Sequence, residues 1–163
     1  MPEDFIGLNV GAGQTEIHPN IRNMEIEPGK NIDYVGSVTD VPCLDDTFDV
    51  VFAQEVREHV DSPQVAIKEI YRVLKKGGCV YLQLPFIIGY HPCPNDYWRF
   101  SHQGIRELLS SDQFEIIDFG VTVGPAVGFY RILVEFLAIC LSLGIEALYK
   151  PVKLLASVVC WPL

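Results

Sequence analysis

The stretch at residues 8–29, LNVGAGQTEIHPNIRNMEIEPG, constrains the fold of this chain more than any other. An apolar run ends in two glycines, Gly11 and Gly13, and a second apolar run ends in an acidic residue, Glu25. Glycine after a strand lets the backbone approach a ligand and adopt conformations that side chains forbid. In open α/β sheets, ligands bind at the carboxyl ends of the strands. The stretch therefore predicts the start of a nucleotide site.

Short apolar runs bounded by turn residues predict five strands, at residues 5–10, 21–26, 32–36, 48–53 and 79–85. Several are apolar almost throughout, as is typical of parallel strands covered on both faces. A helix is predicted before the last strand, capped by Asp61 or Ser62, with Pro63 in its first turn. We expect Lys75 and Lys76 in its last turn and Gly77 at its end. Strand, helix and strand at this spacing indicate right-handed crossovers.

A second helix is predicted from Ser101, followed by a strand at residues 114–120. The pattern as a whole predicts an α/β, doubly wound, mostly parallel sheet in a single domain over residues 1–163. We divide this domain into a cofactor-binding half (1–88), an acceptor-side loop, helix and strand (89–125) and an apolar helical tail (126–163).

The predicted ligand has a ribose but no phosphates. Glu25 ends the second strand and is placed to accept hydrogen bonds from both ribose hydroxyls. A dinucleotide site requires a third glycine opening a helix, and that glycine is missing. The segment QTEIHPN is too short and too rich in turn residues for a full first helix, so we expect that helix to be shortened. An NAD-type enzyme is therefore disfavoured, and S-adenosylmethionine (SAM) satisfies the pattern.

The segments LNVGAG, MEIEPG, VTDVPCLDDTFDVVFAQEVREHV and EIYRVLKKGGCVYLQLP resemble the class I SAM-dependent methyltransferases of the type-11 group. The resemblance covers about residues 6 to 86. It implies a Rossmann-like sheet, SAM as cofactor and methyl transfer to a small-molecule or sugar-type acceptor.

The resemblance also implies where each part of the cofactor lies. The methionine and ribose would be lined by the glycine loop, the adenine by residues after strands two and three, and the sulfonium by residues after strand four. The implied cofactor residues are Asn9, Gly11, Ala12, Gly13, Glu25, Ile26, Ser37, Val38, Gln54, Glu55 and Val56. Asn9 and Ser37 stand where many relatives carry an acidic residue. A degenerate SAM-binding protein with a structural or regulatory role is therefore kept as the alternative.

The segment at residues 85–104, PFIIGYHPCPNDYWRFSHQG, leaves the carboxyl edge of the sheet and can carry the acceptor-side groups. The predicted catalytic residues are His91, Asp96, Tyr97 and Arg99, with His91 as the general base if the acceptor needs one. The alternative is that the aromatic residues pack this loop down, Trp98 and Phe100 above all, and that Asp96 pairs with Arg99.

We expect no metal site. Asp45, Asp46 and Asp49 are typical of a solvated turn, and His91, Cys93 and His102 lack the tight spacing of zinc ligands. Glu58 and His59 resemble an acid–base pair, but we expect them to orient a short helix.

Composition excludes some partners and suggests a compartment. The net charge is −9 and the sequence pI is about 4.8, so nucleic acid binding is not expected. Five scattered cysteines, with no C-x-x-C, are typical of reduced thiols in a cytoplasmic protein.

The tail from residue 128 onward is the most apolar part of the chain. Arg131 and Glu135 lie one helical turn apart and are expected to pair. The stretch after them is apolar nearly all round and therefore needs cover on more than one face. We expect a second copy of the chain to supply this cover, in a homo-oligomer. The alternatives are a membrane surface, with the protein peripheral to the bilayer, and residues lost from a truncated chain.

Overall fold

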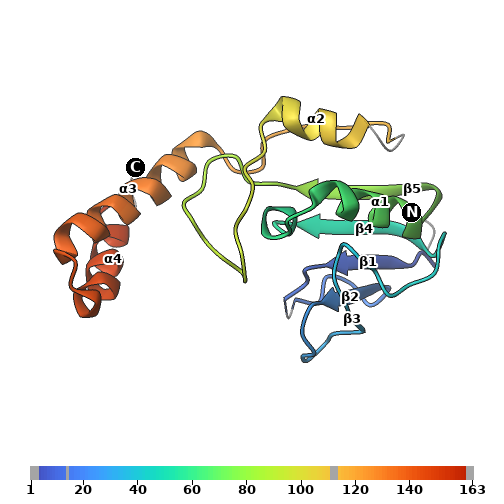
Figure 1. Ribbon diagram of the computed structural model, residues 1–163, viewed down its shortest axis with the longest axis horizontal. Helices are drawn as coiled ribbons and strands as arrows, with labels where there is room; N and C mark the ends of the chain where they lie inside the picture. The colour runs from blue at the N-terminus through green and yellow to red at the C-terminus, as the bar shows by residue number, and fades with distance from the viewer. Residues whose placement is uncertain (1–3, 14, 111–113, 161–163) are drawn as a thin grey trace. The chain divides into compact units, whose positions relative to one another are not determined.

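The computed structural model describes residues 4–13, 15–110 and 114–160 (Figure 1). The chain divides into two compact units, the first made of Met1–Pro85 and Pro92–Ile116, the second of Phe86–His91 and Ile117–Leu163. The division does not follow the boundaries we drew at residues 88 and 125, because residues 92–116 return to the first unit.

The first unit is built on a parallel sheet of five strands in the order β3-β2-β1-β4-β5. The strands are β1 (Gly7–Val10), β2 (Ile21–Glu25), β3 (Tyr34–Val35), β4 (Phe48–Gln54) and β5 (Leu74–Gln83). Val10 in β1 is in register with Met24 in β2 and with Ala53 in β4. The strand order therefore reverses at β1, which places a topological switch point between β1 and β4. The predicted parallel α/β sheet is confirmed.

The helices of the first unit are η1 (Arg57–His59), α1 (Pro63–Val73) and α2 (His102–Ser110). No helix is found in the described residues between β1 and β2, which confirms the shortened first helix. Helix α1 begins as predicted, with Ser62 as N-cap and Pro63 in its first turn. Its predicted end is wrong, because the helix stops at Val73 and Lys75 lies in β5. Leu74, the residue directly after the helix, already pairs with Phe48 of β4, so the backbone is extended from this residue onward.

The core of the first unit lies on one face of the sheet. Leu8, Val10, Met24, Val51 and Ala53 are buried there together with Ala66, Ile70 and Val73 of α1. A second cluster joins Ile67 of α1 to Phe100 and to Leu108 and Leu109 of α2. Leu82 of β5 packs against both clusters, so α1 and α2 cover the same face of the sheet. Phe52 and Tyr81 point to the opposite face, with their ring centroids 6.1 Å apart and both rings partly exposed.

The predicted strand at residues 114–120 is wrong, since the structure has no strand there. Two side chains hold the segment against the first unit, without the backbone hydrogen bonds of a strand. The ring of Phe114 stacks edge-on against Tyr71 of α1 at 5.4 Å, and Ile116 packs on the cluster around Ile67. Ile117, which follows, is almost fully exposed.

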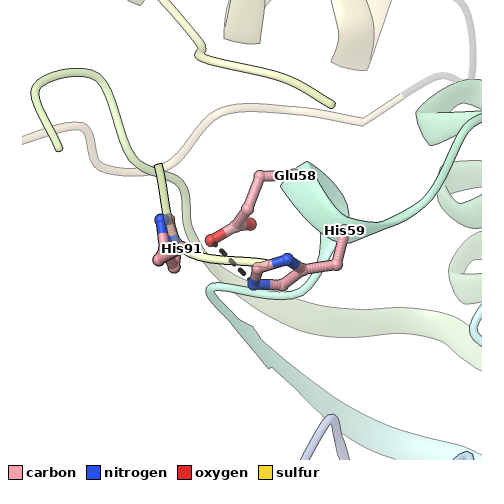
Figure 2. A group of neighbouring side chains, drawn as sticks. All are labelled: Glu58, His59 and His91. Carbon is pink, nitrogen blue, oxygen red and sulfur yellow. Dashed lines mark ion pairs between the residues drawn. The ribbon is translucent and has the colours of Figure 1, made fainter. Parts of the chain in front are cut away.

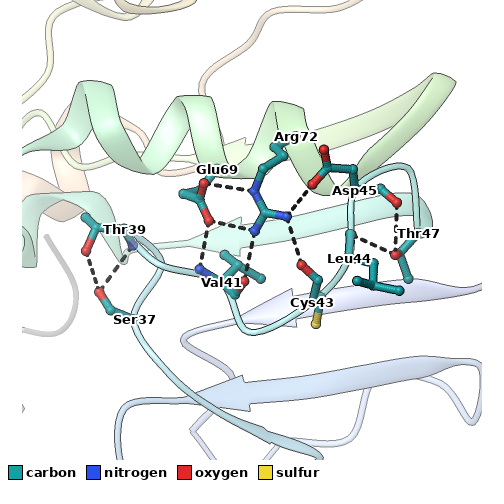
Figure 3. A network of polar contacts seen from close by, with 9 residues as sticks. All are labelled: Ser37, Thr39, Val41, Cys43, Leu44, Asp45, Thr47, Glu69 and Arg72. Carbon is teal, nitrogen blue, oxygen red and sulfur yellow. Dashed lines mark hydrogen bonds and ion pairs between the residues drawn. The ribbon is translucent and has the colours of Figure 1, made fainter.

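A polar network centred on Arg72 fixes the connection between β3 and β4 to helix α1 (Figure 3). The guanidinium donates to both carboxylate oxygens of Glu69, at 2.9 and 2.8 Å, and to Asp45 at 2.7 Å. It also donates to the carbonyl oxygens of Val41 and Cys43, at 2.9 and 2.8 Å. These contacts raise the pKa of Arg72 and lower the pKa of Glu69. Asp45 thus lies in a turn, as predicted, and the structure adds an ion pair with Arg72 that the sequence did not indicate.

The second unit contains a helical hairpin, formed by α3 (Pro125–Ser142) and α4 (Glu146–Cys160). Leu143 and Gly144 make the turn with φ values of +53° and +74°. Val134 of α3 packs with Ala156 and Cys160 of α4. The predicted pair between Arg131 and Glu135 is wrong, because Glu135 pairs with Lys153 of α4 instead, at 2.6 Å.

Candidate functional site

The loop after β1 has the backbone conformation that its glycines permit. Gly11 and Gly13 have φ values of +65° and +58°, in the left-handed region that other residues rarely adopt. The N–H groups of Gly11 and Ala12 donate to the carbonyl oxygen of Met24 in β2, at 3.0 and 3.3 Å. The loop therefore turns back over the carboxyl end of β2.

Glu25 ends β2 beside this loop. Its Oε1 accepts a hydrogen bond from the N–H of Gly13 at 2.5 Å, and its Oε2 accepts one from the N–H of Ile26 at 3.2 Å. The carboxylate is partly exposed, as is the apolar side chain of Ile26. An acidic group and an apolar surface thus adjoin a loop with no bulky side chains.

The segment after β4 closes the other side of the loop. A Cβ placed on Gly11 would lie 2.3 Å from Cγ2 of Val56, whereas a Cβ on Gly13 would meet nothing within 4 Å. Glu55 adopts a φ of +51°, and its N–H donates to the carbonyl oxygen of Gln83 at 2.9 Å. Gly11 is thus required by a neighbouring side chain, and the space at Gly13 is open.

Gln83, at the end of β5, is a residue that the sequence reasoning did not select. Its side-chain Oε1 accepts a hydrogen bond from Nε2 of Gln54 at 3.3 Å. Two amides therefore lie side by side at the carboxyl ends of β4 and β5. The available signal was a polar residue closing an otherwise apolar run, as Glu25 closes the run of β2.

Asn9 acts on the loop through a second asparagine. Both side chains are buried, and Nδ2 of Asn9 donates to Oδ1 of Asn23 at 3.2 Å. Nδ2 of Asn23 in turn donates to the carbonyl oxygens of Thr15 and Asn31, each at 3.0 Å. Asn9 therefore contributes to holding the two loops around Glu25. Asn23 was missed, although a polar residue inside a buried strand is a signal that the sequence contains.

The predicted adenine-side residues differ in what they can offer. Val38 is buried in the main core cluster, so its side chain is not available to a ligand. Ser37 is partly exposed, with its Oγ 2.7 Å from Oγ1 of Thr39. If this segment contacts a ligand, its backbone and Ser37 can do so.

The residues present suit a nucleoside better than a nucleotide. The polar groups at the loop are backbone N–H groups and the Glu25 carboxylate, which is an acceptor for hydroxyl donors and repels phosphate. Between this loop and β2, residues 15–20 form no helix whose N-terminus could face a pyrophosphate. The site therefore fits the adenosine part of SAM.

The acceptor-side segment is bound to η1 by its backbone. The N–H of Tyr97 donates to the carbonyl oxygen of Glu58 at 2.6 Å, and Nε1 of Trp98 donates to that of Val60 at 3.0 Å. Nδ1 of His59 lies 2.5 Å from the carbonyl oxygen of Asn95. The structure therefore places residues 95–98 directly over the short helix after β4.

Asp96 and Arg99 form a two-pronged ion pair within this segment. Nη1 and Nη2 of Arg99 donate to the two carboxylate oxygens of Asp96, at 2.5 and 2.8 Å. The Asp96 side chain is only 1 % exposed, and its carboxylate raises the pKa of Arg99. These contacts agree with the packing interpretation for Asp96, Arg99 and the buried Phe100, while Tyr97 stays half exposed.

Glu58 and His59 lie next to one another in η1, as Figure 2 shows. Nε2 of His59 lies 3.7 Å from Oε1 of Glu58, whose side chain is fully buried. The pair thus belongs to a short helix, as expected. His91, which Figure 2 also labels, belongs to the second unit, where its Nδ1 lies 3.0 Å from the carbonyl oxygen of Gly89.

Arg57 precedes this pair and is fully buried. Within the described residues, none of its three guanidinium nitrogens has a hydrogen-bond partner. Burial alone lowers the pKa of Arg57 to about 9. A buried charge without hydrogen-bond partners is held at a cost in stability.

The comparisons with known proteins agree with this geometry. The family model described as a methyltransferase domain matches residues 8–82. The chain is 24 % identical over 123 residues to the O-methyltransferase resE of Aspergillus sclerotiorum, covering 69 % of this chain and 47 % of that protein. The chain thus spans about half the length of this curated relative.

Solved structures show the same fold. A SAM-dependent methyltransferase from Methanosarcina mazei has a TM-score of 0.57 at 19 % identity, over 73 % of this chain and 83 % of that one. The [4+2]-cyclase SpnF has a TM-score of 0.63 at 21 % identity, over 97 % of this chain and 69 % of that one. One fold thus carries different chemistry in its relatives. The methyltransferase-domain match spans β1 to β5, so this part of the chain is similar to the class I SAM-dependent methyltransferases and has their Rossmann-like fold.

Proposed function

We propose that the first unit binds SAM and transfers its methyl group to a small-molecule or sugar-type acceptor. The observation that carries the proposal is the contact between the Gly13 N–H and the Glu25 carboxylate, at the carboxyl ends of β1 and β2. It joins the flexible glycine turn to the one carboxylate that ends β2. The methyltransferase family whose model matches residues 8–82 uses SAM as its methyl donor.

The chain's own residues would hold the cofactor rather than activate it. Glu25 would accept hydrogen bonds from the ribose hydroxyls, the Gly11–Gly13 backbone would hold the ribose and methionine, and Ile26 would contact the adenine. Gln54, Glu55 and Val56 follow β4 on the other side of the loop. The cofactor, when bound, supplies a methyl group on a sulfonium. The protein then aligns the acceptor and excludes water.

The acceptor side is proposed to involve His91, Asp96, Tyr97 and Arg99 in different roles. Tyr97 is half exposed and can contact an acceptor directly. Asp96 and Arg99 are positioning residues, because they satisfy one another and fix the segment that carries Tyr97. His91 is proposed as the base that removes a proton from a hydroxyl or ammonium acceptor.

Thermal unfolding with S-adenosylhomocysteine tests the cofactor proposal. A ligand at about a hundred times its Kd stabilises the folded state by about 2.7 kcal/mol, which raises the melting temperature by several degrees. We expect this rise with S-adenosylhomocysteine and none with NAD. Glu25→Ala should remove it, whereas Glu27→Ala, an exposed neighbour of the same charge, should leave it intact. No shift in the unmodified protein would reject SAM binding.

The degenerate SAM-binding protein remains the second candidate, because Asn9 is engaged with Asn23. It predicts the same thermal shift with no methyl transfer. Transfer of a labelled methyl group to a panel of hydroxyl, amine and sugar acceptors separates the two candidates. Transfer to any of them excludes the degenerate protein.

A further inference from the structure

The α3–α4 hairpin carries its large apolar side chains on the outside. Phe129, Ile132, Phe136 and Ile139 recur along the exposed side of α3, three or four residues apart. On α4 the exposed apolar residues are Leu148, Leu154, Leu155, Val158 and Val159. Monomeric soluble proteins rarely expose continuous apolar surface of this kind.

The contact between the two helices includes several small residues. Gly128, Ala138 and Ser142 of α3 are buried, as are Ala156 and Cys160 of α4. The larger Val134 is buried with them, and Leu133 and Leu137 pack partly against this cluster. A Cβ on Gly128 would lie 2.6 Å from Cγ2 of Ile87 within the same unit. Small residues at the contact are typical of helix pairs surrounded by lipid.

One ion pair joins the two helices of the hairpin. Glu135 accepts a hydrogen bond from the Tyr149 hydroxyl and pairs with Lys153 at 2.6 Å. Both side chains are partly exposed and line a cavity of about 560 Å³, together with Arg131, Lys150 and residues 88–91. Pairing lowers the cost of keeping these charges close to hydrocarbon.

The occupant of the outer surface follows from its extent. A second copy of the chain, which the sequence favours, covers one face of a helix. Here α3 and α4 each present an apolar side away from the other helix, so two separate surfaces need cover. Lipid acyl chains cover both at once. Helix α3 is also long and apolar enough to span a membrane, judged by its length and composition.

We infer that the α3–α4 hairpin is a monotopic membrane anchor, lying in the plane of the bilayer interface with its outer apolar side chains among the acyl chains. The in-plane orientation follows from the charges. Glu146 and Lys150 lie within the first two turns after the hairpin turn, and Arg131 lies near the start of α3. Insertion with the turn leading would carry Glu146 and Lys150 into hydrocarbon, which is unfavourable. An in-plane hairpin keeps all charges near the headgroups.

Vesicle flotation with the full chain tests this inference. The probes are phosphatidylcholine vesicles, with and without phosphatidylglycerol. The double variant Phe136→Glu/Leu155→Glu changes one exposed side chain on each helix, at 60 % and 65 % exposure. We expect the unmodified protein to float with vesicles and the variant to lose about tenfold in partitioning. Leu44→Glu, an exposed apolar residue in the first unit, is the matched control and should float normally.

Two further measurements, the depth of the hairpin in the bilayer and the oligomeric state of the protein, distinguish the remaining outcomes. Brominated acyl chains should quench a tryptophan introduced as Phe136→Trp, and should not quench one introduced as Leu44→Trp. The far-ultraviolet spectrum of each variant confirms that it is folded. A full chain that fails to float overturns the inference. So does a dimer by light scattering that only the double variant disrupts. Protease protection of Glu146 inside sealed vesicles would overturn the in-plane orientation in favour of a span.

Discussion

A Cβ atom on Gly11 would lie 2.3 Å from Cγ2 of Val56, so the first glycine of the loop is in contact with the segment that follows β4. The loop after β1 and the turn after β4 therefore fit together before any ligand is considered. A side chain added at Gly11 would therefore meet the protein itself.

Because of this contact, substitutions at Gly11 and Gly13 should lower the stability of the folded protein by different amounts. Gly11→Ala should lower the free energy of unfolding by about 3 kcal/mol, since it combines backbone strain with overlap against Val56. Gly13→Ala should cost about 1 kcal/mol, because its φ is strained but its Cβ meets nothing. Urea unfolding of both variants gives the comparison. Equal losses would show that the overlap with Val56 is relieved at little cost.

The buried guanidinium of Arg57 is expected to destabilise the folded protein. Arg57→Met should raise the free energy of unfolding by about 1 to 4 kcal/mol, because an apolar side chain of similar length has no charge to desolvate. Chemical denaturation at pH 7 measures the difference. A large loss of stability would mean that the guanidinium has a partner in solution.

Arg57 also predicts the direction in which the stability of the folded protein changes with pH. Burial lowers the pKa of Arg57 to about 9 on folding, so above about pH 9 the unfolded state binds more protons than the folded state. Stability contributed by this group should rise as pH increases through about 9. The advantage of Arg57→Met over the unmodified protein should therefore shrink from pH 8 to about pH 10.5. A constant difference across this range would contradict the lowered pKa.

The Arg72 network should stabilise the folded protein less in acid than at neutral pH. Arg72 lowers the pKa of Glu69, so the pair stabilises the fold above the ordinary value of 4.5 and loses this contribution as pH falls below it. Arg72→Ala should cost about 2 kcal/mol at pH 7. Unfolding at pH 7 and pH 3 should show that the cost shrinks in acid. Lys153→Ala, which removes a positive charge in the other unit, should show no such trend in the first unit's transition.

The acceptor-side residues divide into two experimental classes. Arg99→Ala leaves the nearly fully buried Asp96 carboxylate without its partner, so it should cost about 3 kcal/mol of stability as well as methyl transfer. Arg99→Lys should restore part of both. His91→Ala should lower methyl transfer with little change in stability or in the affinity for S-adenosylhomocysteine. Lost cofactor affinity in His91→Ala would assign this histidine to the cofactor instead.

The parts of the fold that the sequence predicted are those controlled by neighbouring residues. These parts are the strands through Val10, Glu25 and Gln54, and the start of α1 at Pro63 after Ser62. They also include the lack of a helix between β1 and β2 in the described residues. All of them depend on local apolar runs and turn residues. Local propensity and burial pattern agree at these positions, so tertiary contacts did not change them. The glycine loop and its acidic partner could be found for the same reason.

The remainder was decided by contacts between residues far apart in sequence. Leu74 and Lys75 were assigned to a helix but entered β5, because pairing with β4 was available. Residues 114–120 have strand composition, yet the side chains of Phe114 and Ile116 attach them without a ladder. Spacing alone paired Glu135 with Arg131, and the second helix supplied Lys153 in its place. A sequence pattern shows what kinds of contact a residue can make. The tertiary structure alone determines which partner lies within reach.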